Sequence, residues 1–324
     1  MPFKEVKSYQ PPMPLRNGHL NTILTSQLRK VPMQYERERI DTPDQDFLDL
    51  DFSRVGSRTG IIVIHGLGGE SGSSYVKGIA RTINEAGWDA IALNMRGCSG
   101  EENRRYVSYH SGKTDDLATT IAYLETKGDY DQLGVLGFSL GGNVTLKYMG
   151  DMGADVPPIV KATAAISVPC DLKAAAIALS KWDNIIYLLR FLKMLKAKAR
   201  EKLERFPEQA TFTHKDIDKV KSFADFDNLY TGPAHGYGNA EGYWKHCSSR
   251  FVMPQIQRPS LLLNALDDPF FLPSCFPKEE GQNSKHFHFH QTRYGGHVGY
   301  TDKKFSRSWH EGYAVEFLRE YLEK

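Results

Sequence analysis

A serine flanked by glycines is the first residue of this chain that could do covalent chemistry. Ser139 lies in Gly137-Phe138-Ser139-Leu140-Gly141, directly after the apolar run 132–138 and before NVTLKYMGDM, which can be helical. A G-x-S-x-G pattern between a strand and a helix is typical of a sharp turn that holds a serine in a strained, exposed conformation. The glycines let the backbone pass closely, and the helix aims its first amides at a developing anion. We therefore predict that Ser139 is a nucleophile for acyl transfer rather than an idle serine in a glycine-rich turn.

The loop HGLGG, residues 65–69, could stabilise the oxyanion of such a reaction. It follows the apolar run 60–64. With a serine in this context, one backbone N–H donor comes from the next residue, here Leu140, and a second comes from an upstream loop after a strand. We predict Leu67 as the second donor and expect His65 to position the loop.

The acid and the base should follow the serine in the order acid, then histidine. Asp267 and Asp268 both follow the apolar run 259–265. We favour Asp268, because a proline and two phenylalanines follow it, and expect Asp267 to be a turn or helix-cap carboxylate. His297 lies beyond a glycine pair that can turn the chain back over the sheet, so we predict that it takes the Ser139 proton while Asp268 fixes its tautomer.

Three other histidines form an alternating pattern just before this loop. His286, His288 and His290 alternate with Phe287 and Phe289, so we expect the phenyl rings to face the core and the imidazoles to face outward together. A metal site is the alternative, but same-face side chains on one strand lie about 6 to 7 Å apart, which suits three ligands poorly. We predict neither a metal nor a cofactor.

The elements that must position these residues are short apolar runs separated by helical stretches, as in a parallel sheet buried on both faces. The runs are 60–64, 89–94, 132–138, 161–167, 259–265 and 286–291. An antiparallel hairpin at 37–53 precedes them. The sequence therefore predicts an α/β fold with a mostly parallel central sheet and helices on both faces.

Two segments depart from this alternation. Residues 1–30 carry four prolines and no sustained periodicity, which predicts an extended N-terminal arm. Residues 171–250 separate two sheet strands and contain an amphipathic helical stretch with a basic end, which predicts a helical lid or cap inserted into a core of residues 31–170 and 251–324. A helix packed permanently on the core is an equal alternative, and transient contact of the lid with a membrane surface is a further one.

Overall composition says little about the substrate or binding partner of this protein. The 41 Lys and Arg against 39 Asp and Glu leave a net charge of +2, so nothing calls for nucleic acid. The four cysteines are scattered, which indicates reduced thiols, and the first 24 residues have no apolar run of the kind a signal peptide needs. We expect a cytoplasmic protein that acts on a small molecule or lipid, with its oligomeric state open.

With Ser139, Asp268 and His297 in this order, the chain resembles the α/β-hydrolase superfamily, and within it the YheT-like branch related to the ABHD lipid hydrolases. The stretches that carry the resemblance are NGHLNTIL, DFLDLDF, HGLGG, NMRGCSGEENR, YHSGKTDD, GFSLGGN, NALDDPF and GGHVGY. The resemblance implies a serine carboxylesterase or lipase-like acyl hydrolase without a cofactor, and it supports Asp268 as the acid. Transfer of the acyl group to an alcohol is the first alternative, and a non-catalytic binding module is the second.

Two weaker patterns stay open at this level. H-x-x-x-x-D spacings occur at His110 with Asp115 and at His297 with Asp302. For His110, a loop residue before a helix is the expected role. Residues 96–100, RGCSG, could either shape a pocket or cap a helix.

Overall fold

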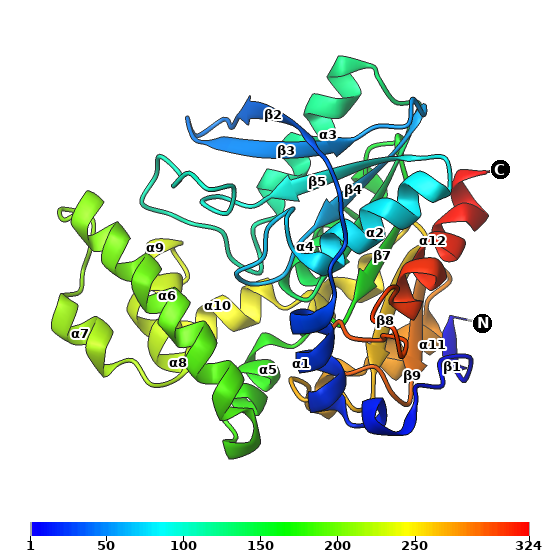
Figure 1. The fold of residues 1–324 in the computed structure, drawn as a ribbon. Helices are drawn as coiled ribbons and strands as arrows, with labels where there is room; N and C mark the ends of the chain where they lie inside the picture. The colour runs from blue at the N-terminus through cyan, green and yellow to red at the C-terminus, as the bar shows by residue number, and fades with distance from the viewer. Residues whose placement is uncertain (1, 324) are drawn as a thin grey trace.

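A central sheet of nine strands runs through residues 2–323, which are the residues that the computed structural model describes (Figure 1). Its order is β1-β9-β8-β7-β6-β4-β5-β3-β2. β3 is antiparallel to its two neighbours, and all other neighbouring pairs are parallel. The strands are β1 (Phe3–Val6), β2 (Glu36–Asp41), β3 (Phe47–Ser53), β4 (Thr59–Ile64), β5 (Asp89–Asn94), β6 (Gln132–Phe138), β7 (Val160–Ile166), β8 (Ser260–Ala265) and β9 (Phe287–Thr292).

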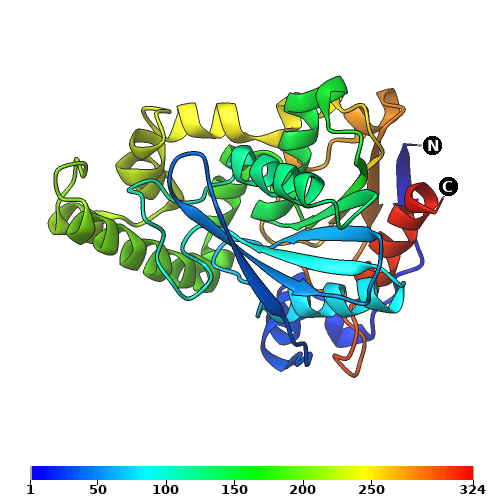
Figure 2. The same ribbon diagram turned by 90° about the horizontal axis from the view of Figure 1, so that it is seen from above.

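Helices cover both faces of this sheet (Figure 2). α3 (Thr114–Lys127) and α4 (Leu140–Met152) bury Leu117, Ile121 and Met149 in one hydrophobic cluster. α2 (Ser74–Glu85) and α12 (Trp309–Leu322) bury their apolar stripes in a second cluster on the other face. Because both faces are covered, the inner strands can be apolar at every position. The predicted α/β fold with a mostly parallel sheet is confirmed.

The chain between β7 and β8 forms a group of helices that projects beyond one end of the sheet (Figures 1 and 2). Its outer part has a hydrophobic cluster of its own, to which Tyr106 contributes from a loop outside the segment. Its inner part is bonded to the core, since Asn143 of α4 donates to the Cys247 carbonyl at 2.7 Å. The helices are α5 (Leu172–Leu179), the 3-10 helix η3 (Trp182–Asn184), α6 (Ile185–Arg205), α7 (His214–Lys219), α8 (Phe223–Phe226), the π-helix η4 (Asp227–Thr231), α9 (Gly232–Ala234), α10 (Ala240–Cys247) and the 3-10 helix η5 (Ser249–Gln255).

The N-terminal arm is only partly extended, so the expectation for residues 1–30 is wrong over part of its length. β1 adds a strand beside β9, but residues Gly18–Leu28 form helix α1. Asn17 caps this helix by accepting a hydrogen bond from Leu20 N at 3.0 Å. The buried positions of α1 are Gly18, Asn21 and Thr25. These residues are small or polar, so their helical spacing leaves no apolar periodicity to read.

β9 also corrects one expectation about the histidines. Phe287 and Phe289 are fully buried, as predicted. His290, however, is buried as well, and its Nδ1 lies 2.9 Å from the Tyr313 hydroxyl of α12. His286 is exposed as predicted, but α12 lies over His288 and His290, so only the start of the imidazole face is solvated. Within residues 2–323, no group of three potential ligands has the geometry to hold a metal ion, and no helix is long and apolar enough to cross a membrane.

Candidate active site

Three sequence-distant side chains meet at the carboxyl ends of β6, β8 and β9. The Nε2 atom of His297 lies 2.9 Å from Ser139 Oγ, and its Nδ1 atom lies 2.8 Å from Asp268 Oδ2. Asp268 is buried, and its Oδ1 accepts a hydrogen bond from Phe270 N at 2.9 Å. The Phe270 ring lies 4.2 Å from the His297 ring and covers it. The arrangement can pass a proton from a serine hydroxyl to an imidazole that a carboxylate orients.

The backbone at Ser139 is strained in the way that the sequence predicts. Its φ of 51° and ψ of −117° lie in a region that residues other than glycine rarely adopt. A Cβ atom on Gly137 would lie 2.3 Å from Gly141 O, and one on Gly141 would lie 2.5 Å from His65 O. Both glycines are therefore needed so that the turn can close against β4.

The HGLGG loop lies against this turn. A Cβ on Gly66 would lie 3.1 Å from Ser139 Cβ, so the loop approaches the serine closely. The Gly66 and Gly68 amides donate to the hydroxyls of Tyr75 and Tyr109, each at 2.9 Å. Leu67 lies between these two anchored amides, and both Leu67 and Leu140 line the cavity that contains Ser139.

His65 supports the loop rather than the chemistry. Its Nε2 accepts from Met95 N at 3.1 Å, so its Nδ1 carries the proton and donates to Gly66 O at 2.8 Å. Burial lowers the pKa of His65 to about 4. The imidazole is therefore neutral and fixed at neutral pH, in line with the positioning role expected for it.

The loop that carries His297 is held by groups that the sequence reading did not single out. Thr22 Oγ1, on α1, accepts from His297 N at 2.7 Å, and Ser167 Oγ accepts from Val298 N at 2.9 Å. A Cβ on Gly296 would lie 2.4 Å from Gly18 O, so the arm and the loop are in direct backbone contact. The motif NGHLNTIL contains both Gly18 and Thr22, but no local pattern says which loop they touch.

The two neighbouring aspartates have different environments. Asp267 Oδ1 accepts from Gly296 N at 2.9 Å, while its Oδ2 is buried without a hydrogen-bond partner among the described residues. Burial, with a smaller contribution from the nearby Asp268, raises the pKa of Asp267 to about 7. Asp267 is thus a loop-anchoring carboxyl, and only Asp268 contacts the His297 ring.

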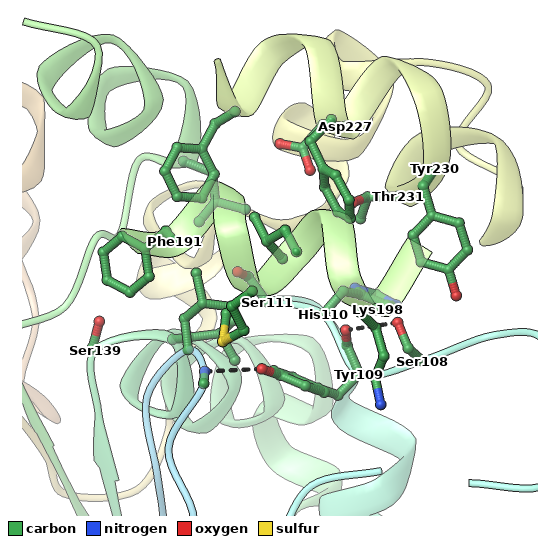
Figure 3. A pocket seen from close by; sticks show the side chains of 18 of the residues that line it. Ser108, Tyr109, His110, Ser111, Ser139, Phe191, Lys198, Asp227, Tyr230 and Thr231 are labelled. Atoms are coloured by element: carbon green, nitrogen blue, oxygen red, sulfur yellow. Dashed lines mark hydrogen bonds between the residues drawn. The ribbon is translucent and has the colours of Figure 1, made fainter. Parts of the chain in front are cut away.

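A cavity of about 530 Å³ opens from Ser139 into the space beneath the inserted helices. Figure 3 shows Ser139 at one end of this view and Ser108, Lys198 and Tyr230 at the other. The core contributes its loops to the cavity, and the inserted segment contributes an apolar wall that includes Leu172, Leu179, Phe191, Met194, Leu195 and Phe226. A cavity of this size and polarity suits the apolar part of an ester.

The two H-x-x-x-x-D spacings do not correspond to contacts between their histidine and their aspartate. His110 is buried, lines the cavity and packs 4.4 Å from the His235 ring, whereas Asp115 is exposed and pairs with Lys113. Asp302 accepts hydrogen bonds from Lys304 N and Ser306 N. Neither histidine is therefore bonded to the aspartate five positions later.

The RGCSG stretch helps to shape the cavity, whereas no residue of it caps a helix, since α3 has no side-chain cap hydrogen bond. Arg96 is buried and forms ion pairs with Asp116, Asp44 and Asp46 at 2.7, 2.7 and 3.2 Å. Asp116 lies in the first turn of α3, so Arg96 anchors that helix. Gly97, Cys98 and Gly100 line the cavity.

Comparison with known proteins shows which fold family the chain belongs to. The profile of the alpha/beta hydrolase fold matches residues 60–291, and the chain belongs to this family. Among solved structures, an esterase of Pyrococcus furiosus superposes with a TM-score of 0.61 at 16% identity, covering 98% of each chain, which shows the shared fold.

The branch follows from two named relatives. The Escherichia coli protein named "Putative esterase YheT" is 31% identical over 99% of this chain and 96% of its own. Human "Phospholipase ABHD3" is 27% identical over 91% of this chain and 74% of its own. The predicted place in the YheT-like branch, related to the ABHD hydrolases, is confirmed.

Proposed function

We propose that this chain is a serine carboxylesterase of the lipase-like type, which cleaves a carboxylic ester through an acyl-Ser139 intermediate. His297 takes the Ser139 proton as Oγ attacks the ester carbonyl, and Asp268 stabilises the resulting imidazolium. The N–H groups of Leu67 and Leu140 donate to the oxyanion, and His297 returns the proton to the leaving alcohol. Water then attacks the acyl-enzyme with His297 as base, which releases the acid and regenerates Ser139.

The observation that carries this proposal is the chain of two short contacts from Ser139 Oγ through His297 to Asp268, at 2.9 and 2.8 Å. The strained turn at Ser139, the glycine loop beside it and the apolar cavity in front of it support the same reaction. The names of the relatives, an esterase and a phospholipase, agree with it.

Residues 171–250 are the proposed lid. Their side chains form much of the cavity wall, so they are placed to choose the ester. Trp182, Ile186 and Leu189 are 87, 69 and 61% exposed near the start of α6. Such a cluster supports transient contact of the lid with a lipid surface. A cytoplasmic location stays a prediction.

The test is labelling by a fluorophosphonate, followed by hydrolysis of p-nitrophenyl esters of increasing acyl length. We expect labelling and turnover in the native protein and the loss of both in Ser139→Ala. Persistence of both in that variant would exclude the serine mechanism. Turnover with glycerol or ethanol present, analysed for new esters, separates hydrolysis from transfer to an alcohol.

A further inference from the structure

One carboxylate in the wall of the cavity has no role in the proposed reaction. Asp227 begins the π-helix η4 and is only 6% exposed, yet it lines the cavity together with Tyr230 and Thr231 of the same turn (Figure 3). π-Helical turns are rare and often occur at functional sites. The irregular turn therefore presents a buried acid to the space that receives the substrate.

The partners of Asp227 are all neutral. Its Oδ2 accepts from Trp244 Nε1 at 2.8 Å. No Lys, Arg or His in the described part of the chain forms an ion pair with it. Burial raises the pKa of Asp227 to about 6, against the lowering effect of its hydrogen bonds from Thr231 and Trp244. At neutral pH Asp227 is therefore mostly ionised, and no cation among residues 2–323 is paired with it.

Charge and aromatic surface around Asp227 favour a cation. The described residues of the cavity wall include four acids, Glu70, Glu102, Glu201 and Asp227, against one lysine or arginine, Lys198. Lys198 pairs with Glu102, and Glu201 pairs with Arg205, which leaves Glu70 and Asp227 as the acids of the described wall that form no ion pair. The buried His110 adds no charge, because burial lowers the pKa of its imidazole well below the ordinary range.

Aromatic rings lie on the same wall. Phe223, Phe226 and Tyr230 lie within four positions of Asp227 in the chain, and the Phe226 and Tyr230 rings lie 5.8 Å apart. Trp244 donates its indole N–H to Asp227. Aromatic faces beside a carboxylate attract an ammonium or quaternary ammonium group, because the ring quadrupole and the negative charge act together. An uncharged acyl chain would gain nothing from a buried acid.

We propose that Asp227 and the aromatic side chains around it bind an ammonium or quaternary ammonium group carried by the ester substrate. The inference rests on the proposed esterase function of Ser139, since both groups line one cavity. It makes Asp227 a specificity-determining residue that does not touch the reacting bond.

The test uses two pairs of matched compounds. Choline and its uncharged isostere 3,3-dimethyl-1-butanol are titrated into the protein by calorimetry, and butyrylcholine and 3,3-dimethylbutyl butyrate are compared as substrates. We expect the native protein to bind choline about fivefold more tightly than the isostere, or better, and to show a matching difference in KM. In Asp227→Asn, which keeps an acceptor for Trp244, both differences should disappear while turnover of the uncharged ester persists.

Asp218→Asn is the matched control. Asp218 is an exposed acid of the same inserted segment, pairs with Arg200, and is absent from the cavity wall, so its loss should leave the choline preference intact. Equal binding of choline and the isostere by the native protein, or no detectable binding of choline, overturns the proposal even if Asp227→Asn fails to fold. A choline preference that survives in Asp227→Asn overturns it as well. If choline binds as expected but neither ester is cleaved, the esterase function fails and the ammonium site stands.

Discussion

Thr22 Oγ1 accepts a hydrogen bond of 2.7 Å from the backbone N–H of His297, across 275 positions of sequence. The N-terminal helix α1 thereby fixes the start of the loop that delivers the imidazole to Ser139. Gly18, one turn earlier on the helix, lies against Gly296 and the Asp267 carbonyl, where a side chain would collide. The arm is thus a structural part of the candidate active site.

We expect Thr22→Val to lower kcat about tenfold and the stability by about 1–2 kcal/mol. The substitution preserves shape but leaves the His297 N–H without its acceptor, and small displacements of a catalytic base are costly. Kinetics on a p-nitrophenyl ester and urea unfolding measure the two effects. Thr22→Ser should retain most activity. Thr119→Val, which removes a similar hydroxyl bond to Asp115 O on the exposed side of α3, is the matched control and should leave kcat unchanged.

The two neighbouring aspartates should differ sharply when each is changed to asparagine. Asp268→Asn is expected to lower kcat about 10³- to 10⁴-fold, because an amide cannot hold the imidazole in the required tautomer or stabilise its charge. Asp267→Asn keeps an acceptor for Gly296 N and should lose far less. Steady-state kinetics measure kcat for both variants. A larger loss of kcat in Asp267→Asn than in Asp268→Asn would mean that Asp267 is the acid.

Asp267 should also make stability depend on pH. Its pKa is raised to about 7 in the folded state by burial, so its protonated form is favoured on folding. The resulting stabilisation is complete at acid pH, below the ordinary carboxyl pKa, and is lost as the pH rises through about 7. Asp267→Asn should therefore be more stable than the native chain by about 1–3 kcal/mol at pH 9 and nearly equal to it at pH 4. Urea unfolding at several pH values measures this, and a difference that does not vary with pH would contradict it.

Arg96 should matter for stability rather than for chemistry. Arg96→Met is expected to cost about 3–5 kcal/mol, because it leaves Asp46 and Asp116 buried without their cation. The midpoint of urea unfolding measures the effect. Arg58→Met, which breaks the exposed pair with Asp131, is the control and should change the midpoint little. Equal effects of the two substitutions would show that the buried cluster contributes no more than a surface pair.

The sequence alone determined the parts of the site that a short stretch of chain encodes. The sharp turn at Ser139 depends on glycines two residues away on either side. The HGLGG loop depends on a strand that ends beside it. The parallel strands could be recognised because burial on both faces requires continuous apolar runs, and those runs fall where the strands are.

The tertiary structure decided what depends on contacts between distant segments. Helix α1 was missed because its buried stripe is polar and its stability comes from the loop it supports. The face of β9 with His288 and His290 was misjudged because alternation shows that two faces differ, but not that α12 covers the second. Asp268 and Asp267 are neighbours with the same side chain, and only the path of the His297 loop brings one to the imidazole and the other to a backbone amide. The proposed role of Asp227 in binding a cation could not be inferred from the sequence either, because its aromatic surroundings form only when the inserted helices fold over the cavity.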